Sequence, residues 1–382
     1  MVKDILLFFK KETFLILLYF IAFVINILFL ILAYKLGFLQ IENYIIIITA
    51  TSLMSALFYS LVIKSKKIKE KISLKLKPEG LKSIIFFFLV LLIFLHNKED
   101  IFFTLFFISS VISEFLLNLA LTKHQINGRS YKHAFVRIFQ GLIKLITLLL
   151  IVYTNNIVKI GLLYNFIIII FFSSVIKDYN FKIDKKKKNF GNFDVLYTLT
   201  GASLFQLDKI ISAMYLDVNV NVIIKYFIIF KISSIFQILG NIISQPIRNL
   251  LIEKKLININ IEKKINTIFY LLLSFLVLTN LILLIINAFE LISFLKIVII
   301  AKDIIIYNLF SLAFILHIRS GFYLDRLYLN SQSLYLTKVN IICIIIICSA
   351  IYLFNDPIVW SLSIFISQIL LVIFSKKITK IF

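Results

Sequence analysis

The chain has 382 residues, of which 61% are hydrophobic and only 16% are charged, and its mean hydropathy is +1.02. A soluble domain of this length would need a far more polar surface, so the composition excludes an ordinary soluble protein. The net charge of +22 invites a nucleic-acid-binding interpretation. The basic residues stand in short clusters between apolar runs, however, which is typical of the loops of a membrane protein without a nucleic acid partner.

Apolar runs long enough to cross a lipid bilayer as helices of about 20 residues recur along the chain. They fall near 13–34, 41–63, 81–96, 101–122, 134–153, 157–176, 194–216, 222–246, 266–288, 304–324, 334–354 and 357–375. The third run is short, and charged residues interrupt 289–303, which is interpreted as an interfacial segment. The sequence therefore predicts an all-α polytopic membrane protein with about 12 transmembrane helices.

Charge alternates between successive loops. Basic clusters follow every second predicted span, at 64–77, 123–137, 177–188, 248–264 and 317–326, and the chain ends in a basic tail at 376–380. The loops between them are nearly neutral. Because basic loops stay in the cytoplasm, both termini are predicted to be cytoplasmic. No cleavable signal peptide is expected, since Lys10-Lys11-Glu12 precedes an apolar run without a small-residue cleavage site.

The middle basic loop separates six predicted spans from six. We predict an N-terminal six-helix bundle at 1–180, a basic cytoplasmic linker at 181–193 and a C-terminal six-helix bundle at 194–382. A weak internal similarity supports two halves. The segment 124–130, before the fifth predicted span, resembles the segment 329–333, before the eleventh. Paired halves around a central cavity are typical of transporters.

Two ionisable side chains fall near the middle of neighbouring predicted spans. Lys144 shares a helix face with Arg137, and Glu114 lies at a similar depth in the span before it. An ammonium group facing lipid is costly, so Lys144 is expected to face a cavity or a carboxylate. A structural Glu114–Lys144 pair and a substrate or proton site are both open interpretations.

Polar stripes run along two apolar helices predicted between 194 and 248. The first stripe contains Asp208, which is expected to pair with a basic residue or to bind a cation. Lys209 lies about 100° away on the helix and is expected to snorkel towards water. The second stripe contains Gln237 and Asn241 and ends at Arg248. Such stripes are typical of the wall of a hydrated cavity in a membrane protein.

Arginines gather near the predicted cytoplasmic ends of the spans, at Arg137, Arg248, Arg319 and Arg326. Some of them would only enforce topology. Together they could also attract an anionic headgroup, because guanidinium forks match phosphate oxygens.

The chain has no convincing motif for hydrolysis or group transfer. It contains four His, no phosphate-binding glycine loop and no His/Cys spacing suited to a metal. Cys343 and Cys348 lie in one apolar run and are interpreted as small hydrophobic residues. We therefore expect neither an enzyme nor a resident cofactor.

Several short motifs stand in the second half of the chain. They are Leu207-Asp208-Lys209-Ile210-Ile211, Tyr226-Phe227, Lys231-Ile232-Ser233-Ser234, and the segment 237–248 with Ser244-Gln245-Pro246. Together they resemble the Wzx-type polysaccharide flippases of the multidrug/oligosaccharidyl-lipid/polysaccharide exporter superfamily. The layout of twelve spans in two halves extends the resemblance over nearly the full chain.

The resemblance implies translocation of oligosaccharide units on undecaprenyl pyrophosphate, from the cytoplasmic to the outer leaflet of a bacterial cytoplasmic membrane, for O-antigen or capsule synthesis. Lys144, Arg137, Arg248, Arg319, Gln237 and Asn241 would then contact the substrate. Asp208 and Glu114 would couple transport to a proton or sodium gradient. Other glycan-assembly membrane proteins would be its partners.

Two alternatives stay open. A multidrug or cation exporter of the same superfamily would prefer an acidic cavity, against the basic bias of this chain. A non-transporting component of glycan assembly is the other, either a polymerase or ligase, which would need a large external loop, or a scaffold.

Overall fold

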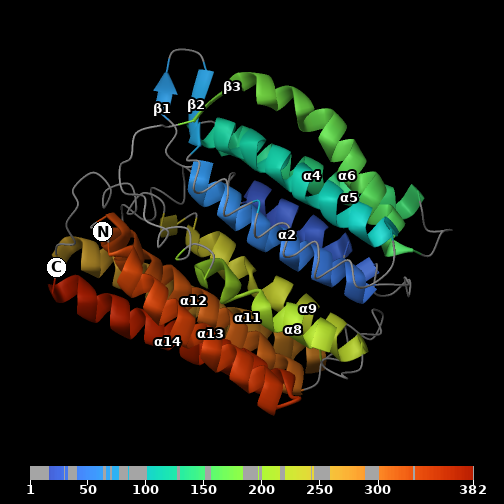
Figure 1. Cartoon of the computed structure of the whole chain (residues 1–382). Coiled ribbons are helices and arrows are strands. Elements are labelled where there is room, and N and C mark those ends of the chain that lie inside the picture. The colour runs from blue at the N-terminus through green and yellow to red at the C-terminus, as the bar shows by residue number, and fades with distance from the viewer. Residues whose placement is uncertain are drawn as a thin grey trace. The chain divides into compact units, whose positions relative to one another are not determined.

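The computed structural model (Figure 1) describes most of the chain. The described residues are 17–29, 31–32, 41–62, 66–68, 71–76, 85, 101–126, 130–150, 156–183, 197, 200–215, 220–241, 243–244, 259–288, 301–329 and 332–381. Contacts divide the chain into two compact units, Met1–Met214 and Tyr215–Phe382. The predicted boundaries at 180 and 194 stay a prediction.

Long helices dominate the first unit. They are α2 (Ile41–Val62), α4 (Ile101–Ile126), α5 (Ser130–Leu150) and α6 (Ile157–Phe172), the last continued by the 3-10 helix η2 (Ser173–Asp178). Helix α4 packs against the other three. The Asn156 side chain accepts hydrogen bonds from the N–H groups of Val158 and Lys159, which satisfies donors left open at the start of α6.

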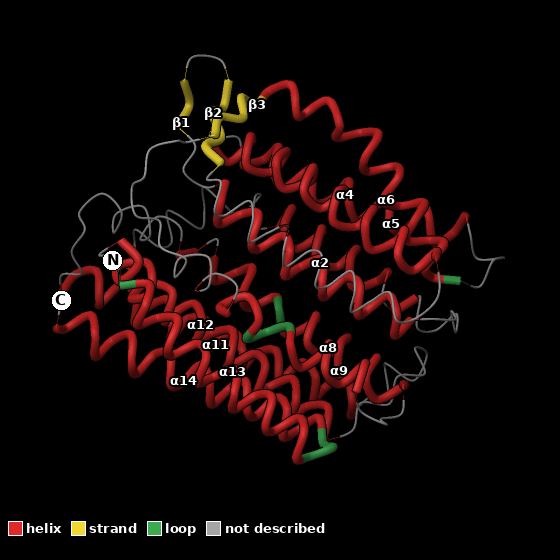
Figure 2. Tube along the Cα trace, in the orientation of Figure 1, coloured by secondary structure: helices red, strands yellow, loops and turns green. Residues whose placement is uncertain are grey.

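A small sheet lies at one end of these helices, drawn as yellow strands in Figure 2. Strand β1 (Lys66–Ile68) pairs antiparallel with β2 (Lys71–Leu76), and β2 pairs parallel with β3 (Tyr179–Ile183). The chain is almost entirely helical, as predicted, but this sheet is an addition to the predicted all-α fold. Its central strand reads Lys-Ile-Ser-Leu-Lys-Leu, a two-residue alternation that favours a strand.

The second unit is built around α12 (Ala301–Leu329). This helix packs against α9 (Val220–Ser233), α11 (Ile259–Ala288), α13 (Ser333–Leu353) and α14 (Pro357–Ile381). Its buried core is aromatic, because the Tyr226 ring lies 5.1 Å from Phe310 and 5.5 Å, edge-on, from Trp360. Edge-on and tilted ring pairs of this kind stabilise a packed interior.

Eight of the described helical segments are long and apolar enough to cross a membrane. They are Ile101–Leu121, Tyr131–Leu150, Ile157–Asp178, Asn221–Asn241, Glu262–Leu283, Ala301–Leu324, Leu334–Leu353 and Pro357–Thr379. Each coincides with a predicted span. The shorter apolar helices Leu17–Phe29 and Tyr44–Met54 lie within the first two predicted spans. The chain therefore has the several long apolar helices of a multi-pass membrane protein.

Some predictions fall on residues outside the described part of the chain. These are the third predicted span apart from residue 85, Lys10-Lys11-Glu12, most of the linker, and 289–300.

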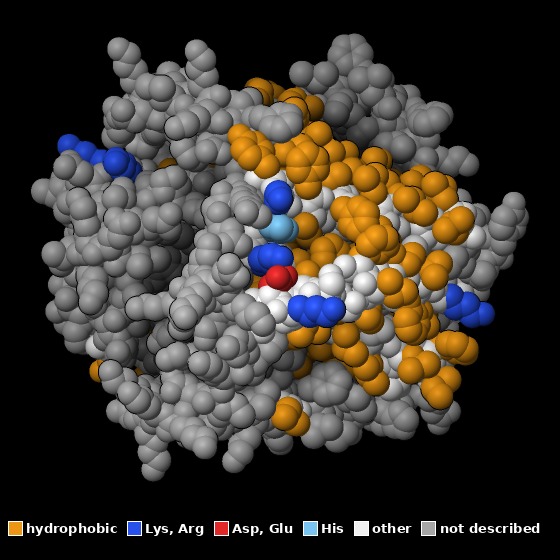
Figure 3. Space-filling view, turned by 90° about the horizontal axis from the view of Figure 1, so that it is seen from above, with side chains coloured by type: hydrophobic (Ala, Val, Ile, Leu, Met, Phe, Trp, Pro, Cys, Tyr) orange, Lys and Arg blue, Asp and Glu red, His pale blue; other side chains and the backbone are white. Residues whose placement is uncertain are grey.

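Large hydrophobic side chains are exposed along the apolar helices. Ile170 on α6 is 72% exposed and Leu149 on α5 is 68% exposed. Figure 3 shows a face where hydrophobic side chains cover much of the described surface and charged side chains are confined to a few places. Exposed apolar side chains along these helices fit contact with lipid rather than with water.

Candidate functional site

The first candidate cation, Arg137, lies on α5 in the first unit. Its Nη1 donates a hydrogen bond to the Oε1 of Gln140, one turn further along the helix, at 3.1 Å. Gln140 is buried, which fixes this amide in place. Among the described residues no carboxylate forms an ion pair with Arg137, so its charge is oriented by a neutral group.

Lys144 lies two turns further along α5. Its ammonium donates to the Oδ1 of Asn26 at 3.2 Å and lies 5.3 Å from the centre of the buried Tyr164 ring. Glu114 on α4 accepts a long hydrogen bond of 3.5 Å from the Nδ2 of Asn118. No ion pair joins Lys144 to Glu114 within the described part of the chain, and the contacts of Lys144 include an amide and an aromatic ring.

Asp208 and Lys209 form a buried ion pair at a break in a helix. Helical residues 200–203 end in a turn at 204–206, and α8 (Leu207–Tyr215) starts directly afterwards. The Lys209 ammonium donates to both Asp208 carboxylate oxygens, at 2.7 and 2.9 Å, and to the Phe205 carbonyl of the turn at 2.7 Å. Both side chains are fully buried.

The expectation that Lys209 snorkels towards water is therefore wrong. Its stem is long enough to fold back over the preceding turn, where a carbonyl at the helix break and the neighbouring carboxylate both accept from it. A cation or proton at Asp208 would have to compete with this ammonium. The assignment of Asp208 and Glu114 to ion coupling stays a prediction.

Arg319 lies on α12 in the second unit, facing α11. Its Nη2 donates to the Oδ1 of Asn266 at 3.2 Å, and its guanidinium carbon lies 4.6 Å from the centre of the Phe269 ring. The Arg319 Nε is buried without a hydrogen-bond partner among the described residues. Nearby Glu262 pairs with Lys376 instead, at 3.2 Å.

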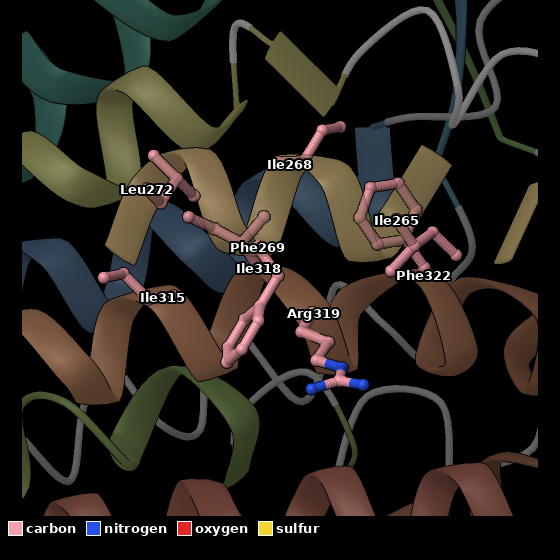
Figure 4. Close-up of a pocket in the computed structure, with 8 residues that line it drawn as sticks. All are labelled: Ile265, Ile268, Phe269, Leu272, Ile315, Ile318, Arg319 and Phe322. Carbon is pink, nitrogen blue, oxygen red and sulfur yellow. The ribbon is translucent and has the colours of Figure 1, made fainter. Parts of the chain in front are cut away.

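Arg319 is one of eight residues that line a small pocket between α11 and α12 (Figure 4). The seven other lining residues are apolar. Almost none of this space is wide enough for a water molecule, so an oligosaccharide could not enter it.

The other predicted substrate residues lie on or beyond the helix that follows α9. Gln237 is partly buried and Asn241 is exposed, four residues further on, and so on the same face. Arg248 lies outside the described residues, as does the side chain of Arg326. The structure thus orients Arg137, Lys144 and Arg319, each by a neutral amide.

A buried polar cluster between α4 and α6 was not predicted. Asn165 donates to the hydroxyls of Ser109 and Ser110 at 3.0 and 2.7 Å, and accepts from the hydroxyl of Ser113 at 2.9 Å. A lone Asn within the apolar run 157–176 was the signal for it, because an amide in lipid needs partners. These three partners are all serine hydroxyls, so the cluster joins two helices through uncharged groups.

Ion pairs also mark the two ends of the second unit. At the start of α12, Lys302 contacts Asp356 at 2.9 Å and Asp303 contacts Lys225 at 2.6 Å, whereas Lys376 and Glu262 meet near the other end of that helix. Burial alone would raise the pKa of Asp356. Hydrogen bonds from Lys302 and the Ile358 N–H, together with the Lys302 charge, outweigh it and lower that pKa below its usual value.

The described residues contain no group of three or more His, Cys, Asp or Glu suited to a metal ion. No protein-family model, curated protein or solved structure matches the chain. Its function must therefore be inferred from the chemistry of its own side chains.

Proposed function

We propose that this chain is a Wzx-type flippase. It moves undecaprenyl-pyrophosphate-linked oligosaccharide units from the cytoplasmic to the outer leaflet of a bacterial cytoplasmic membrane, for surface polysaccharide synthesis. In this proposal the chain has twelve transmembrane helices, in two six-helix halves around a central cavity, and both termini are cytoplasmic.

The observation that carries the proposal is the state of Arg319. A guanidinium inside an apolar helix is costly, and such residues usually serve a function or pair with a carboxylate. Arg319 is held by Asn266 and Phe269, retains a buried Nε donor, and has no carboxylate partner in the described part of the chain. A pyrophosphate offers the negative charge and the oxygen acceptors that this guanidinium can use.

Arg137 supports the same interpretation from the first unit. It too is oriented by an amide, that of Gln140, and has no ion-pair partner among the described carboxylates. Each unit therefore presents an arginine whose charge its own described carboxylates leave uncompensated. Each guanidinium can by itself offer a fork of N–H donors to phosphate oxygens.

Ion pairs near the helix ends support the proposed topology. Lys123, after the fourth predicted span, contacts Asp178, after the sixth, at 2.6 Å. Loops that share a contact lie on one side of a membrane, as the alternation of basic loops requires. Transport would then proceed by alternating access, with the prenyl chain remaining in lipid while the sugars cross in water.

Export assays of Arg319 variants test the proposal. A strain lacking this gene would be complemented by wild type, Arg319→Gln, Arg319→Lys or Lys338→Gln, the last removing an exposed lysine on α13. Loss of one charged hydrogen-bonding partner costs about 1.5–3 kcal/mol, so Arg319→Gln should slow export about tenfold or more. Arg319→Lys should be intermediate, because an ammonium keeps the charge without the fork.

The measured quantity is lipid-linked sugar in the cytoplasmic leaflet, at equal abundance of each variant in the membrane. Accumulation with Arg319→Gln but not with Lys338→Gln supports the flippase. Normal export by Arg319→Gln would contradict it. If deletion of the gene caused no accumulation of lipid-linked sugar, the flippase proposal would be rejected. A multidrug or cation exporter, or a non-transporting component of glycan assembly, would then replace it.

A further inference from the structure

The sheet joins two basic loops that are far apart in sequence. In a sheet, residues directly opposite each other on neighbouring strands lie on the same face, and faces alternate along each strand. The registers Lys66↔Ser73 and Ile68↔Lys71 join β1 to β2, and Ser73↔Asn180 and Lys75↔Lys182 join β2 to β3. These pairs define one face, whose basic residues are Lys66, Lys71, Lys75 and Lys182.

The opposite face is mostly apolar. Its residues on β2 and β3 are Ile72, Leu74, Leu76, Tyr179, Phe181 and Ile183. Lys67 of β1, opposite Ile72, is the one lysine in register with this face among the strand residues. The sheet is therefore amphipathic, with four lysines on what we call the basic face.

Tyr179 shows which face meets the helices. Its side chain is buried, and its hydroxyl donates to the carbonyl of Leu119 on α4. Burial, aided by the Asp178 charge, raises the pKa of Tyr179, so the phenol keeps the proton that it donates. The face that contains Tyr179 thus lies towards α4, and the basic face lies away from it.

The sheet also lies where apolar helices end. Strand β3 starts at Tyr179, directly after the apolar segment Ile157–Asp178, and β1 starts at Lys66, shortly after α2 ends at Val62. Lys123 and Asp178 meet at this same end. If these helices cross a bilayer, their ends lie at the depth of the lipid headgroups.

The register makes Lys75 and Lys182 direct partners on neighbouring strands. Lysine positions from two separate loops thus meet on the basic face. Phospholipid headgroups supply anions at this depth, and juxtamembrane lysines attract them.

We propose that the basic face of the sheet is a docking surface for anionic phospholipid headgroups of the adjoining leaflet. The surface requires only that the helices cross a membrane, and it does not depend on whether the chain is a flippase. It anchors the end of the first unit to anionic lipid, at a place formed by residues from two separate loops.

The test is lipid binding to the full-length protein, purified in a neutral detergent. Native mass spectrometry would compare phosphatidylglycerol with phosphatidylcholine of the same acyl chains. Each lysine near an anionic surface contributes about fivefold to binding, so Lys75→Gln/Lys182→Gln should weaken phosphatidylglycerol binding about 25-fold. Phosphatidylcholine binding should not change.

The matched control is Lys263→Gln/Lys264→Gln, which removes the same charge from two exposed positions on α11. It should weaken phosphatidylglycerol binding clearly less than the change at the sheet does, because these two lysines lie outside the basic face. Lys75→Arg/Lys182→Arg keeps the charge and should also bind like wild type, which separates loss of charge from loss of folding.

Equal weakening by both Gln pairs would overturn the proposal, because it would indicate a general attraction by net charge. Unchanged binding by Lys75→Gln/Lys182→Gln would also overturn it. If the Gln pair and the Arg pair at the sheet both weakened phosphatidylglycerol binding, the proposal would also be overturned. The loss would then come from a change in the sheet's structure and not from the loss of its charge.

Discussion

At the scale of single residues, the cations inside apolar helices differ in what holds them. Lys209 is held by a carboxylate, both side chains being fully buried, whereas Arg137 and Arg319 are held by amides. A carboxylate neutralises a cation and makes the pair a structural element. An amide orients a cation and leaves its charge for another ligand. This difference is why the proposed function rests on the arginines.

The Asp208–Lys209 pair is predicted to be structural. Asp208→Asn should destabilise the protein by about 3–5 kcal/mol, because it leaves a fully buried ammonium without its carboxylate. The double variant Asp208→Asn/Lys209→Met removes the charge while keeping a long side chain, and should recover much of that loss. Thermal unfolding in detergent checks both. An Asp208→Asn protein as stable as wild type would contradict this role.

Sequence alone could identify these residues but not their partners. Lys209 follows Asp208 directly in the sequence, so the two residues are neighbours in any fold. The burial of Lys209, however, depends on the helix break at 204–206, where no Pro or Gly indicates a turn. Lys144 was located near the middle of a span, but Asn26, which accepts from it, is 118 residues away. Partners this distant are set by packing of helices, which local periodicity does not encode.

At the scale of elements, the packing of α4 against α6 depends on a close contact between Gly161 of α6 and Phe106 of α4. A Cβ added at Gly161 would lie 2.3 Å from the ring of Phe106, which is itself buried. Asn165, one turn further along α6, makes its hydrogen bonds to serines across the same pair of helices. Small residues and interhelical hydrogen bonds together are a common means of joining helices in lipid.

Gly161→Ala should therefore destabilise the first unit. Overpacking of a tight interior typically costs about 1–3 kcal/mol. Replacing the ring as well, in Gly161→Ala/Phe106→Leu, should restore part of the stability by making room for the methyl group. The midpoint of thermal unfolding measures both effects, and a Gly161→Ala protein of unchanged midpoint would show that Phe106 moves aside freely.

Long helices were the predictable elements and the sheet was not. Eight predicted spans coincide with long apolar helices because an apolar run of this length has few other solutions. The strand β2 is short, lysine-rich and lies in a loop, so its charge was interpreted as a topology signal. Its parallel partner β3 follows only after four further predicted spans, and such non-local pairing leaves no local trace.

At the scale of the whole molecule, the predicted topology can be tested by cysteine labelling. In a protein whose two native cysteines are replaced, Lys71→Cys and Asn180→Cys should each react with a thiol reagent on the cytoplasmic side. Phe354→Cys should react on the outer side. Phe354 is exposed between α13 and α14, and the first two positions belong to paired strands. Membrane-impermeant thiol reagents on intact cells and on inverted vesicles measure this. Reaction of Lys71→Cys and Asn180→Cys from opposite sides would contradict the pairing of β2 with β3.

The parallel pair of β2 and β3 also has a consequence for biogenesis. A ribosome makes β2 before the four predicted spans at 81–96, 101–122, 134–153 and 157–176, and β3 only after them. Since chains are built from the N-terminus, β2 waits at the membrane surface until those four spans have been inserted. The strands can then meet only if β3 emerges on the side where β2 was left. Closure of the sheet therefore requires that the intervening spans cross the membrane an even number of times.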